Sequence, residues 1–263
     1  MDDVVPLAGL APWIGGKRLL AATIVPRIEA VPHRTYCEPF VGMGGIFFRR
    51  RRMPPAEVIN DLSRDVATLF RVLQRHFLPF VDLLRWQVSA RAEFERLMAS
   101  DPVTLTDLER SARFLYLQRT TFGAKVRSRT FGVDPRSGSA FDPTRIIPEL
   151  QAFHDRLARV TIECLPYDAL ITRYDRPETL FYLDPPYWGC EADYGRELFR
   201  REDFERLALQ LAGLRGRFIL SLNDHPEVRR VFSAFAMEEV RTRYSVRGKG
   251  PHKQVGELLI SGP

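Results

Sequence analysis

The residues of this chain best suited to chemistry are the four consecutive ones Asp184-Pro185-Pro186-Tyr187. They follow an apolar run, residues 180–183, which predicts a buried strand, so we expect them at the edge of a sheet. Two prolines hold the backbone extended, which lets the Asp184 carboxylate and the Pro185 carbonyl accept both protons of an exocyclic amine. The Tyr187 ring can stack on a base. The motif therefore predicts a site for a planar substrate that carries an amino group.

A second candidate site is the turn that contains Gly42, Gly44 and Gly45. It follows a strand expected to end near Glu38, and glycines there let the backbone approach a ligand closely. Asp61 lies 23 positions after Glu38, where a nucleoside-binding α/β fold places an acid for the ribose hydroxyls. Since the turn lacks the full phosphate-binding pattern and Glu38 would repel a pyrophosphate, a nucleoside without phosphates is favoured. S-adenosylmethionine is such a nucleoside, and its positive sulfonium suits acidic surroundings.

Other candidates carry a structural alternative beside the functional one. Lys17 lies N-terminal to the glycine turn, close to Trp13, but an exposed lysine at a helix start is the commoner situation. Asp168 follows the strand expected at residues 160–164 and can receive an adenine amino group or cap a helix. Five cations are candidate DNA contacts, with a solvated basic loop as the alternative: Arg119, Lys125, Arg127, Arg129 and Arg136.

The composition fits one large globular domain, or one domain with an insertion, because 45% of the 263 residues are hydrophobic and 27% are charged. The net charge of +6 favours polyanions only weakly. The three cysteines and five histidines lack metal-site or disulfide spacing, so we expect a reducing intracellular environment and no structural metal. We also expect no membrane segment, because no apolar run is long enough, and no secretory signal, because the chain begins with Met1-Asp2-Asp3.

The elements that must position these residues alternate between strands and helices, which is typical of an α/β sheet. We expect strands ending near residue 38 and at 57–59, 160–164, 180–183 and 217–222, and helices at 18–28, 46–52, 64–76 and 202–214. Residues 237–244 and 257–260 are expected to close the sheet as antiparallel strands.

The pattern changes between residues 77 and 158, where strand signals are missing. Helical stretches are expected around residues 81–100 and 107–120, the second one capped by Thr106 with Glu109 three positions later. The basic segment 121–130 and a stretch rich in turn residues, 132–139, follow. We therefore expect residues 77–158 to form an insertion between residues 1–76 and 159–263.

Several motifs occur in the order seen in the Dam family of adenine-N6 DNA methyltransferases, and the chain resembles that family over nearly its whole length. The matching segments are Trp13-Ile14-Gly15-Gly16-Lys17, Glu38-Pro39-Phe40-Val41-Gly42-Met43-Gly44, Asn60-Asp61, Phe114-Leu115-Tyr116-Leu117-Gln118-Arg119, Asp184-Pro185-Pro186-Tyr187 and Val255-Gly256-Glu257-Leu258-Leu259.

The resemblance implies a doubly wound, mostly parallel methyltransferase sheet with a mainly helical target-recognition insertion. It implies S-adenosylmethionine as cofactor, contacted by Trp13, Lys17, Asp61 and Asp184, with Asp184 also reaching the target base. We place Glu38, Pro39 and Phe40 of the glycine-turn motif in the same cofactor site. The family often has Asn where this chain has Gln118, and Phe-Asn-Gly where this chain has Phe122-Gly123-Ala124, so no target sequence is transferred.

The sequence thus predicts methyl transfer to N6 of an adenine that is flipped out of double-stranded DNA. Four alternatives stay open: transfer to N4 of cytosine, to a structured RNA, or to a protein glutamine, and a DNA-binding relative that has lost catalysis. We expect a monomer in a prokaryotic, phage or prophage setting in the cytoplasm, with a possible cognate restriction endonuclease.

Overall fold

The computed structural model describes residues 2–13, 15–126, 128–132, 138–191, 199–243 and 254–262, with the side chains of 241–243 and 254–255 excepted. Ile14 and two of the predicted DNA contacts, Arg127 and Arg136, lie outside the described residues.

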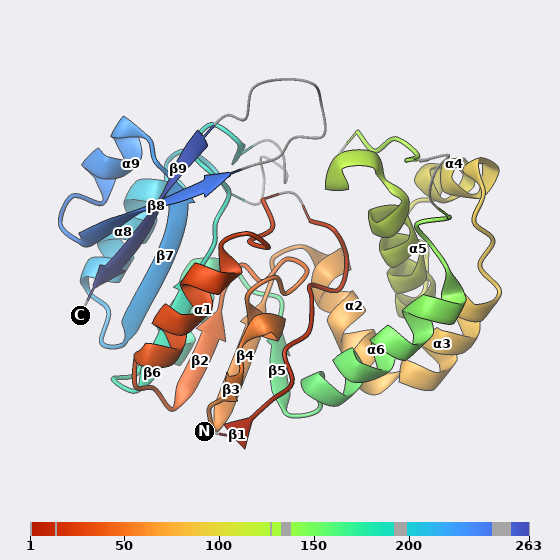
Figure 1. Ribbon diagram of the computed structural model, residues 1–263, viewed down its shortest axis with the longest axis horizontal. Coiled ribbons are helices and arrows are strands. Elements are labelled where there is room, and N and C mark those ends of the chain that lie inside the picture. The colour runs from red at the N-terminus through yellow and green to blue at the C-terminus, as the bar shows by residue number, and fades with distance from the viewer. Residues whose placement is uncertain are drawn as a thin grey trace.

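A seven-stranded, mostly parallel sheet forms the centre of the protein (Figure 1). In their order across the sheet, the strands are β5 (Val160–Glu163), β4 (Ala56–Asn60), β2 (Thr35–Glu38), β6 (Thr179–Leu183), β7 (Arg217–Asn223), β9 (Gln254–Gly262) and β8 (Ala236–Arg243). The first five are parallel to one another, whereas β9 is antiparallel to both β7 and β8. The predicted α/β class and the antiparallel closing strands are confirmed.

The strand order reverses between β2 and β6, since the chain runs outward from β2 to β4 and β5 and then returns to β6 on the other side. In open α/β sheets, ligands bind at such a switch point, outside the carboxyl ends of the strands. The predicted site residues Glu38, Asp61 and Asp184 all lie at or just after the carboxyl end of a strand, namely β2, β4 and β6. The topology therefore brings them to one edge of the sheet.

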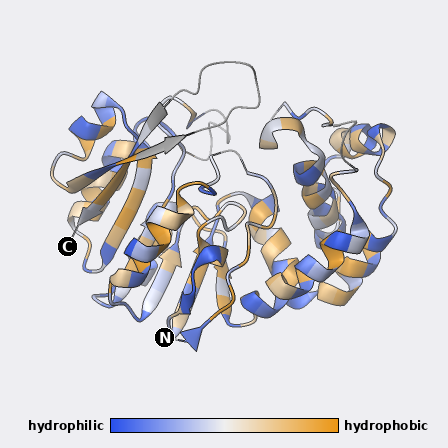
Figure 2. Ribbon diagram, viewed as in Figure 1, coloured by the Kyte–Doolittle hydropathy of each residue, from blue (hydrophilic) through white to orange (hydrophobic). Residues whose placement is uncertain are grey.

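Helices cover both faces of the sheet, which makes it doubly wound. Alternate residues of a strand point to opposite faces, so Leu180 and Tyr182 of β6 join one hydrophobic cluster while Phe181 and Leu183 join the other. The first cluster lies under α1 (Ala21–Ala30) and α2 (Arg64–Arg75), and the second under α7 (Tyr167–Tyr174), α8 (Asp203–Ala212) and α9 (Pro226–Val231). Figure 2 shows hydrophobic and hydrophilic residues side by side along the helices around the sheet.

Residues 77–158 form a group of helices beside the β5 edge of the sheet (Figure 1). These are α3 (Phe77–Arg85), α4 (Arg91–Ala99), α5 (Asp107–Thr120), the short η2 (Phe122–Ala124) and α6 (Pro143–Leu157). The expected capping box is confirmed, because the Thr106 side chain accepts from the Glu109 amide and the Glu109 side chain accepts from the Thr106 amide. The expected helical stretch 81–100 is interrupted at residues 86–90. The division into catalytic domain and insertion stays a prediction, since the hydrophobic core continues from α2 into α5 and α6.

The prediction of a helix at residues 46–52 is wrong. Only the short 3-10 helix η1 (Phe47–Arg49) forms, and the chain then pairs β3 (Arg52–Met53) antiparallel with β1 (Asp2–Asp3). Phe47 and Phe48 are both completely buried, and Arg50 is buried as well, so residues 46–50 lack the exposed side that an amphipathic helix needs.

Arg50 belongs to a buried ionic cluster that ties α6 to the sheet. The Glu57 carboxylate on β4 accepts from Arg50 and from both terminal nitrogens of Arg156 on α6, the latter at 2.6 and 2.8 Å. The Arg50 guanidinium also lies 3.6 Å from the ring centroid of Tyr36 on β2. Because a buried charge that loses its partner is costly, this cluster fixes where the helical group attaches.

Candidate active site

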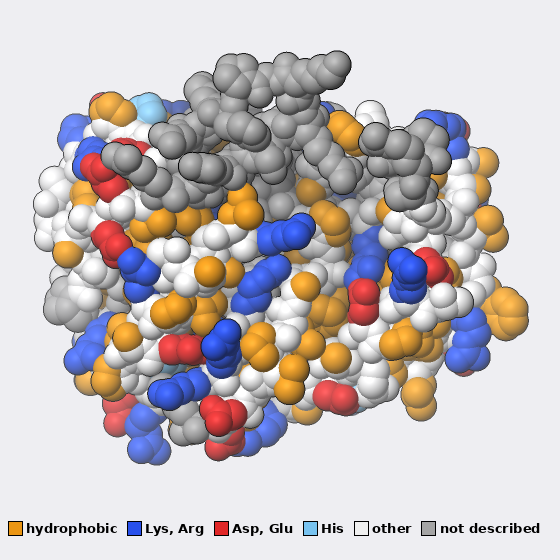
Figure 3. All heavy atoms as spheres, viewed as in Figure 1, with side chains coloured by type: hydrophobic (Ala, Val, Ile, Leu, Met, Phe, Trp, Pro, Cys, Tyr) orange, Lys and Arg blue, Asp and Glu red, His pale blue; other side chains and the backbone are white. Residues whose placement is uncertain are grey.

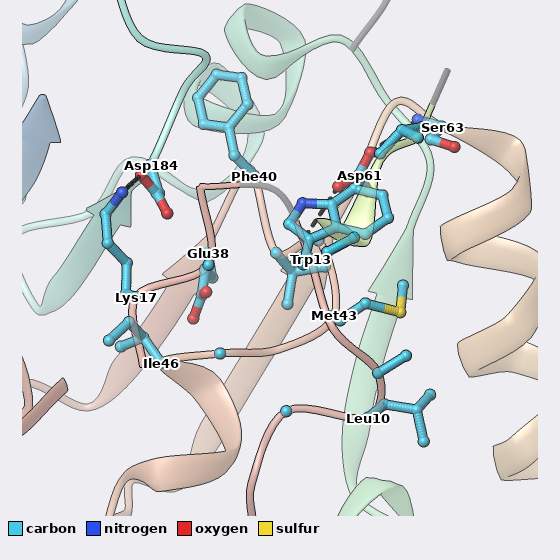
Figure 4. Close-up of a pocket in the computed structure, with 18 of the residues that line it drawn as sticks. Leu10, Trp13, Lys17, Glu38, Phe40, Met43, Ile46, Asp61, Ser63 and Asp184 are labelled. Carbon is cyan, nitrogen blue, oxygen red and sulfur yellow. Dashed lines mark hydrogen bonds and ion pairs between the residues drawn. The ribbon is translucent and has the colours of Figure 1, made fainter. Parts of the chain in front are cut away.

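A cavity of about 650 Å³ opens at the carboxyl ends of β2, β4 and β6. This volume is within the range of small-molecule and cofactor sites. Figure 4 shows Lys17, Glu38 and Asp184 on one side of the cavity and Trp13, Asp61 and Ser63 on the other. The predicted site residues that line it are Trp13, Lys17, Glu38, Pro39, Phe40, Gly42, Asp61, Arg119, Asp184 and Pro186.

The glycine turn forms a wall of the cavity, and its shape depends on missing side chains. Gly42 has a φ of +49°, and a Cβ there would lie only 2.6 Å from Trp13 Nε1. Gly44, with a φ of +71°, does not line the cavity. A Cβ there would lie on the side of the core, only 2.2 Å from the Phe48 ring beneath the turn. Gly42 thus lets Trp13 lie against the backbone, while Gly44 lets the turn close over the core.

Asp61 is held at the turn by two backbone amides. Gly42 N donates to one carboxylate oxygen at 3.0 Å, and Ser63 N donates to the other at 2.9 Å. Burial raises the pKa of Asp61 to about 6 in spite of these bonds. The carboxylate is therefore fixed in orientation and lines a cavity in which it can accept from a hydroxyl.

Glu38 is a buried acid at the end of β2, with only 2% of its surface exposed. Its Oε2 accepts a hydrogen bond of 2.7 Å from the Tyr36 hydroxyl. Burial raises the pKa of Glu38 to about 8, since the ionised form loses its hydration there. A cation that enters the cavity would stabilise this carboxylate.

Asp184 is paired with Lys17 at the end of β6. Lys17 Nζ lies 2.6 Å from Asp184 Oδ1, and the Lys17 side chain is only 1% exposed (Figure 4). Ser221 Oγ donates to the same oxygen at 3.2 Å. Burial raises the pKa of Asp184 to about 6, and the Lys17 charge opposes this rise. The exposed-lysine alternative for Lys17 is excluded, because this side chain is buried.

Tyr187, the last residue of the proline motif, is half-buried and is not among the residues that line the cavity. Its hydroxyl accepts from Lys17 Nζ at 2.6 Å and donates to Glu257 Oε1 on β9, and Lys17 Nζ also lies 4.2 Å from the ring centroid. Glu257 is completely buried. Glu257 belongs to a motif that matches the family pattern. No role for it could be predicted from the sequence, because Tyr187 and Glu257 lie 70 positions apart in the chain.

The backbone after the proline motif is fixed by Asn223 at the end of β7. Trp188 N donates to Asn223 Oδ1 at 2.9 Å, and Asn223 Nδ2 donates to Trp188 O at 3.2 Å. Pro185 is buried and does not line the cavity, whereas Pro186 does. The motif is thus held from both ends, by the Lys17 pair and by Asn223.

Asp168 is not brought into the cavity. It lies exposed in the first turn of α7, where its carboxylate accepts from the amide of Ala169 at 2.8 Å. The residues of this segment that line the cavity are Leu165 and Tyr167. Asp168 does not cap the helix either, because the N-cap of α7 is Pro166.

Two of the predicted DNA contacts point inward. Arg119 donates to Leu10 O and pairs with Glu149, both at 2.8 Å, and its side chain is 15% exposed. Arg129 donates to Gln118 Oε1 at 2.9 Å, and burial lowers its pKa to about 10. Lys125 is exposed. On the face shown in Figure 3, the basic side chains of the described residues are dispersed among acidic and apolar ones.

Gln118, which stands where the family often has Asn, is fully buried. Its amide nitrogen donates to Pro12 O at 2.7 Å and to Ala124 O at 3.1 Å. It therefore joins the segment that carries Trp13 to the turn that carries Lys125.

The doubly wound sheet and the cavity at its switch point define an α/β protein whose cavity has the size and the position of a cofactor site. Residues 13–246 match the family described as D12 class N6 adenine-specific DNA methyltransferase. Since this match spans most of the chain, the chain belongs to that family, which confirms the resemblance found in the sequence.

Two viral proteins are similar to this chain. The DNA N-6-adenine-methyltransferase of Escherichia phage P1 is 27% identical over 264 residues, which cover 94% of this chain but only 34% of the phage protein. The chain thus spans about a third of that relative. The type II methyltransferase M.CviBI of Paramecium bursaria Chlorella virus NC1A is 22% identical, over 88% of this chain and 89% of that protein.

The likeness to solved structures is weaker. The structure of a precorrin 8W decarboxylase from Methanobacterium thermoautotrophicum covers 93% of this chain and 89% of its own, at 10% identity and a TM-score of 0.38. No helix within the described ranges is both long and apolar enough to cross a membrane.

Proposed function

We propose that this protein transfers a methyl group from S-adenosylmethionine to N6 of adenine in DNA. The observation that carries the proposal is the position of Asp184, which lines the nucleoside-sized cavity at the switch point and is fixed by Lys17. Family membership supports adenine as the target base and DNA as the substrate.

The cavity residues fit S-adenosylmethionine, which supplies an activated methyl group when it is bound. Asp61 is oriented to accept from the ribose hydroxyls, and Gly42 leaves the space in which Trp13 lies beside the turn. Glu38, a buried acid with a raised pKa, suits an ammonium group, and acidic surroundings suit a sulfonium. Pro39 and Phe40 complete this wall of the cavity.

Asp184 and the Pro185 carbonyl are the proposed acceptors for the two protons of the adenine amine. That amine is paired and unreachable inside a duplex, so the adenine must rotate out of the helix to reach Asp184. Lys17 keeps the carboxylate aimed at the amine, and Tyr187 is the proposed stacking partner of the base, next to the Pro186 side of the cavity. The protein contributes mainly proximity and alignment in a direct displacement, without a covalent enzyme intermediate.

The helical group of residues 77–158 is the proposed DNA-recognition part, with Lys125 as an exposed candidate contact. Arg119 and Arg129 would have to leave their internal partners in order to reach a phosphate. We also propose that the protein acts as a monomer, because recognition and catalysis lie in one chain, and that a cognate restriction endonuclease is a possible partner.

Isotope-labelled S-adenosylmethionine, incubated with the protein and double-stranded DNA, tests this proposal through the nucleosides released by digestion. Labelled N6-methyladenine supports it. Labelled N4-methylcytosine would instead support the cytosine alternative, and label in RNA or in a protein glutamine would support the other acceptors. A protein that binds DNA but labels no acceptor would be a relative that has lost catalysis.

A further inference from the structure

Some of the charged residues that line the cavity form ion pairs, and others do not. Lys17 pairs with Asp184, and Arg119 pairs with Glu149. Arg18 and Arg49 also line the cavity, and among the residues that the structure describes neither forms an ion pair. The cavity therefore contains two cations whose charge a bound anion can neutralise.

Arg49 is folded back onto the glycine turn. Its Nη1 donates to Gly45 O, and the side chain is half-buried. A methyl group added to Gly45 would lie 3.9 Å from Arg49 Nη1 and 3.6 Å from the backbone nitrogen of Lys17. The Arg49 guanidinium and the Lys17 backbone nitrogen thus both lie beside Gly45.

The charge of Arg18 also acts on Arg49. Burial lowers the pKa of Arg49, and the nearby charge of Arg18 lowers it further. Like charges that act on each other are unfavourable, and an anion bound by both offsets that repulsion. A carboxylate suits the site because guanidinium groups bind carboxylates through paired hydrogen bonds.

We propose that Arg18 and Arg49 bind the α-carboxylate at the amino-acid end of the methyl donor. This inference rests on the proposed function. The donor's amino-acid end is a zwitterion, and the same side of the cavity offers charges for both of its groups. Glu38 faces the cavity beside Lys17 and Ile46 (Figure 4), and the backbone amide of Arg49 donates to Ile46 O at 3.0 Å. Glu38 takes the ammonium group, and the arginine pair takes the carboxylate.

The competing occupant is a DNA phosphate, because Arg18 is exposed. Arg49 favours the carboxylate, since its guanidinium is held against the wall of the donor cavity by Gly45 O. A pair that binds phosphate affects the affinity for DNA and its salt dependence, whereas a pair that binds the donor's carboxylate affects only ligands that carry this group.

Calorimetric titration with two ligands tests the inference. S-adenosylhomocysteine carries the amino-acid end, and 5′-methylthioadenosine lacks it. We expect Arg49→Gln and Arg18→Gln each to weaken S-adenosylhomocysteine binding by about tenfold and to leave 5′-methylthioadenosine binding unchanged. Arg49→Lys should restore part of the loss. Arg217→Gln, an exposed change at the opposite end of β7, is the control and should alter neither affinity.

Three results would overturn the inference. Equal weakening of both ligands would mean that the arginines shape the cavity without contacting the carboxylate. Unchanged affinity for S-adenosylhomocysteine with weaker binding to a DNA duplex would assign the pair to phosphate. If the wild-type protein bound neither ligand, the proposed function itself would fail. This result differs from the case in which the wild-type protein binds the ligands and the variants bind them equally well, which would overturn this inference alone.

Discussion

Lys17 Nζ and Asp184 Oδ1 lie 2.6 Å apart and join the N-terminal motif to the proline motif at the end of β6. Lys17 also donates to the Tyr187 hydroxyl. Because the Lys17 side chain is almost fully buried, these neighbours replace the hydration that its ammonium group has lost. The pair therefore sets both the direction and the ionisation of the carboxylate that we assign to the amine.

Removal of the Asp184 charge should stop methyl transfer without unfolding the protein. Asp184→Asn keeps the shape of the side chain but loses the carboxylate, so we expect kcat to fall by about 10²-fold or more. Incorporation of labelled methyl groups into DNA measures the rate, and S-adenosylhomocysteine titration reports whether the cavity survives. The control is Asp168→Asn, which lies outside the cavity and should keep most of the activity. Full activity of Asp184→Asn would contradict the assignment.

The ionisation of Asp184 should appear in the pH profile, and Glu257 should shift it. Burial raises the pKa of Asp184 to about 6, and the Glu257 charge adds to this rise, so wild-type activity should fall as the pH drops below about 6. Glu257→Gln removes this charge but keeps an acceptor for the Tyr187 hydroxyl. The acid limb of the pH–rate profile, where activity falls with falling pH, should therefore move to lower pH. Initial rates across the pH range measure the limb.

The control for that change is Glu239→Gln on the neighbouring strand β8, an exposed position that should leave the profile unaltered. A general loss of kcat in Glu257→Gln with an unmoved limb would mean that Glu257 only supports the packing around Tyr187.

Glu38 should make the ligand-free protein less stable as the pH rises. Its pKa is about 8 in the folded state, above the ordinary value of 4.5, so the folded protein holds a proton that the unfolded chain has released. The associated stability is fully present at pH below the ordinary value and is lost as the pH rises through 8. Between pH 6 and 9 the loss should be roughly 2 to 3 kcal/mol.

Glu38→Gln cannot ionise and should remove that loss, whereas Glu95→Gln, an exposed change on α4, should not. Urea unfolding at the two pH values measures the difference. If the free energy of unfolding fell equally with pH in the wild-type protein and in Glu38→Gln, Glu38 would already be ionised in the folded state.

The sequence predicted the strand ends and the residues that meet there, because buried parallel strands are continuous apolar runs and βα alternation makes consecutive strands parallel. The order of the strands across the sheet was not predicted. The sequence could not predict that Arg50 is buried. Local periodicity places this charge in solvent, whereas in the structure the Glu57 carboxylate offsets it. The inward turn of Arg129 and the contact between Tyr187 and Glu257 were hidden for the same reason, since they depend on residues distant along the chain.

Disruption of the buried ionic cluster should destabilise the whole protein. Glu57→Gln would leave Arg50 and Arg156 without their carboxylate, so we expect a loss of about 3–5 kcal/mol in the free energy of unfolding. Glu178→Gln is the control, because its contact with Arg34 is exposed and should contribute less than about 1 kcal/mol. Denaturant unfolding compares the two. A small effect of Glu57→Gln would mean that the cluster does not hold α6 to the sheet.

The most direct test of the central claim is a crystal structure of the protein with S-adenosylhomocysteine and a short DNA duplex that contains its target adenine. The measured quantity is the distance from the Asp184 carboxylate to N6 of that adenine. We predict an adenine outside the helix with its amine within hydrogen-bonding distance of Asp184, beside the bound nucleoside. An adenine stacked in the duplex, or a nucleoside bound away from Asp184, would contradict the account.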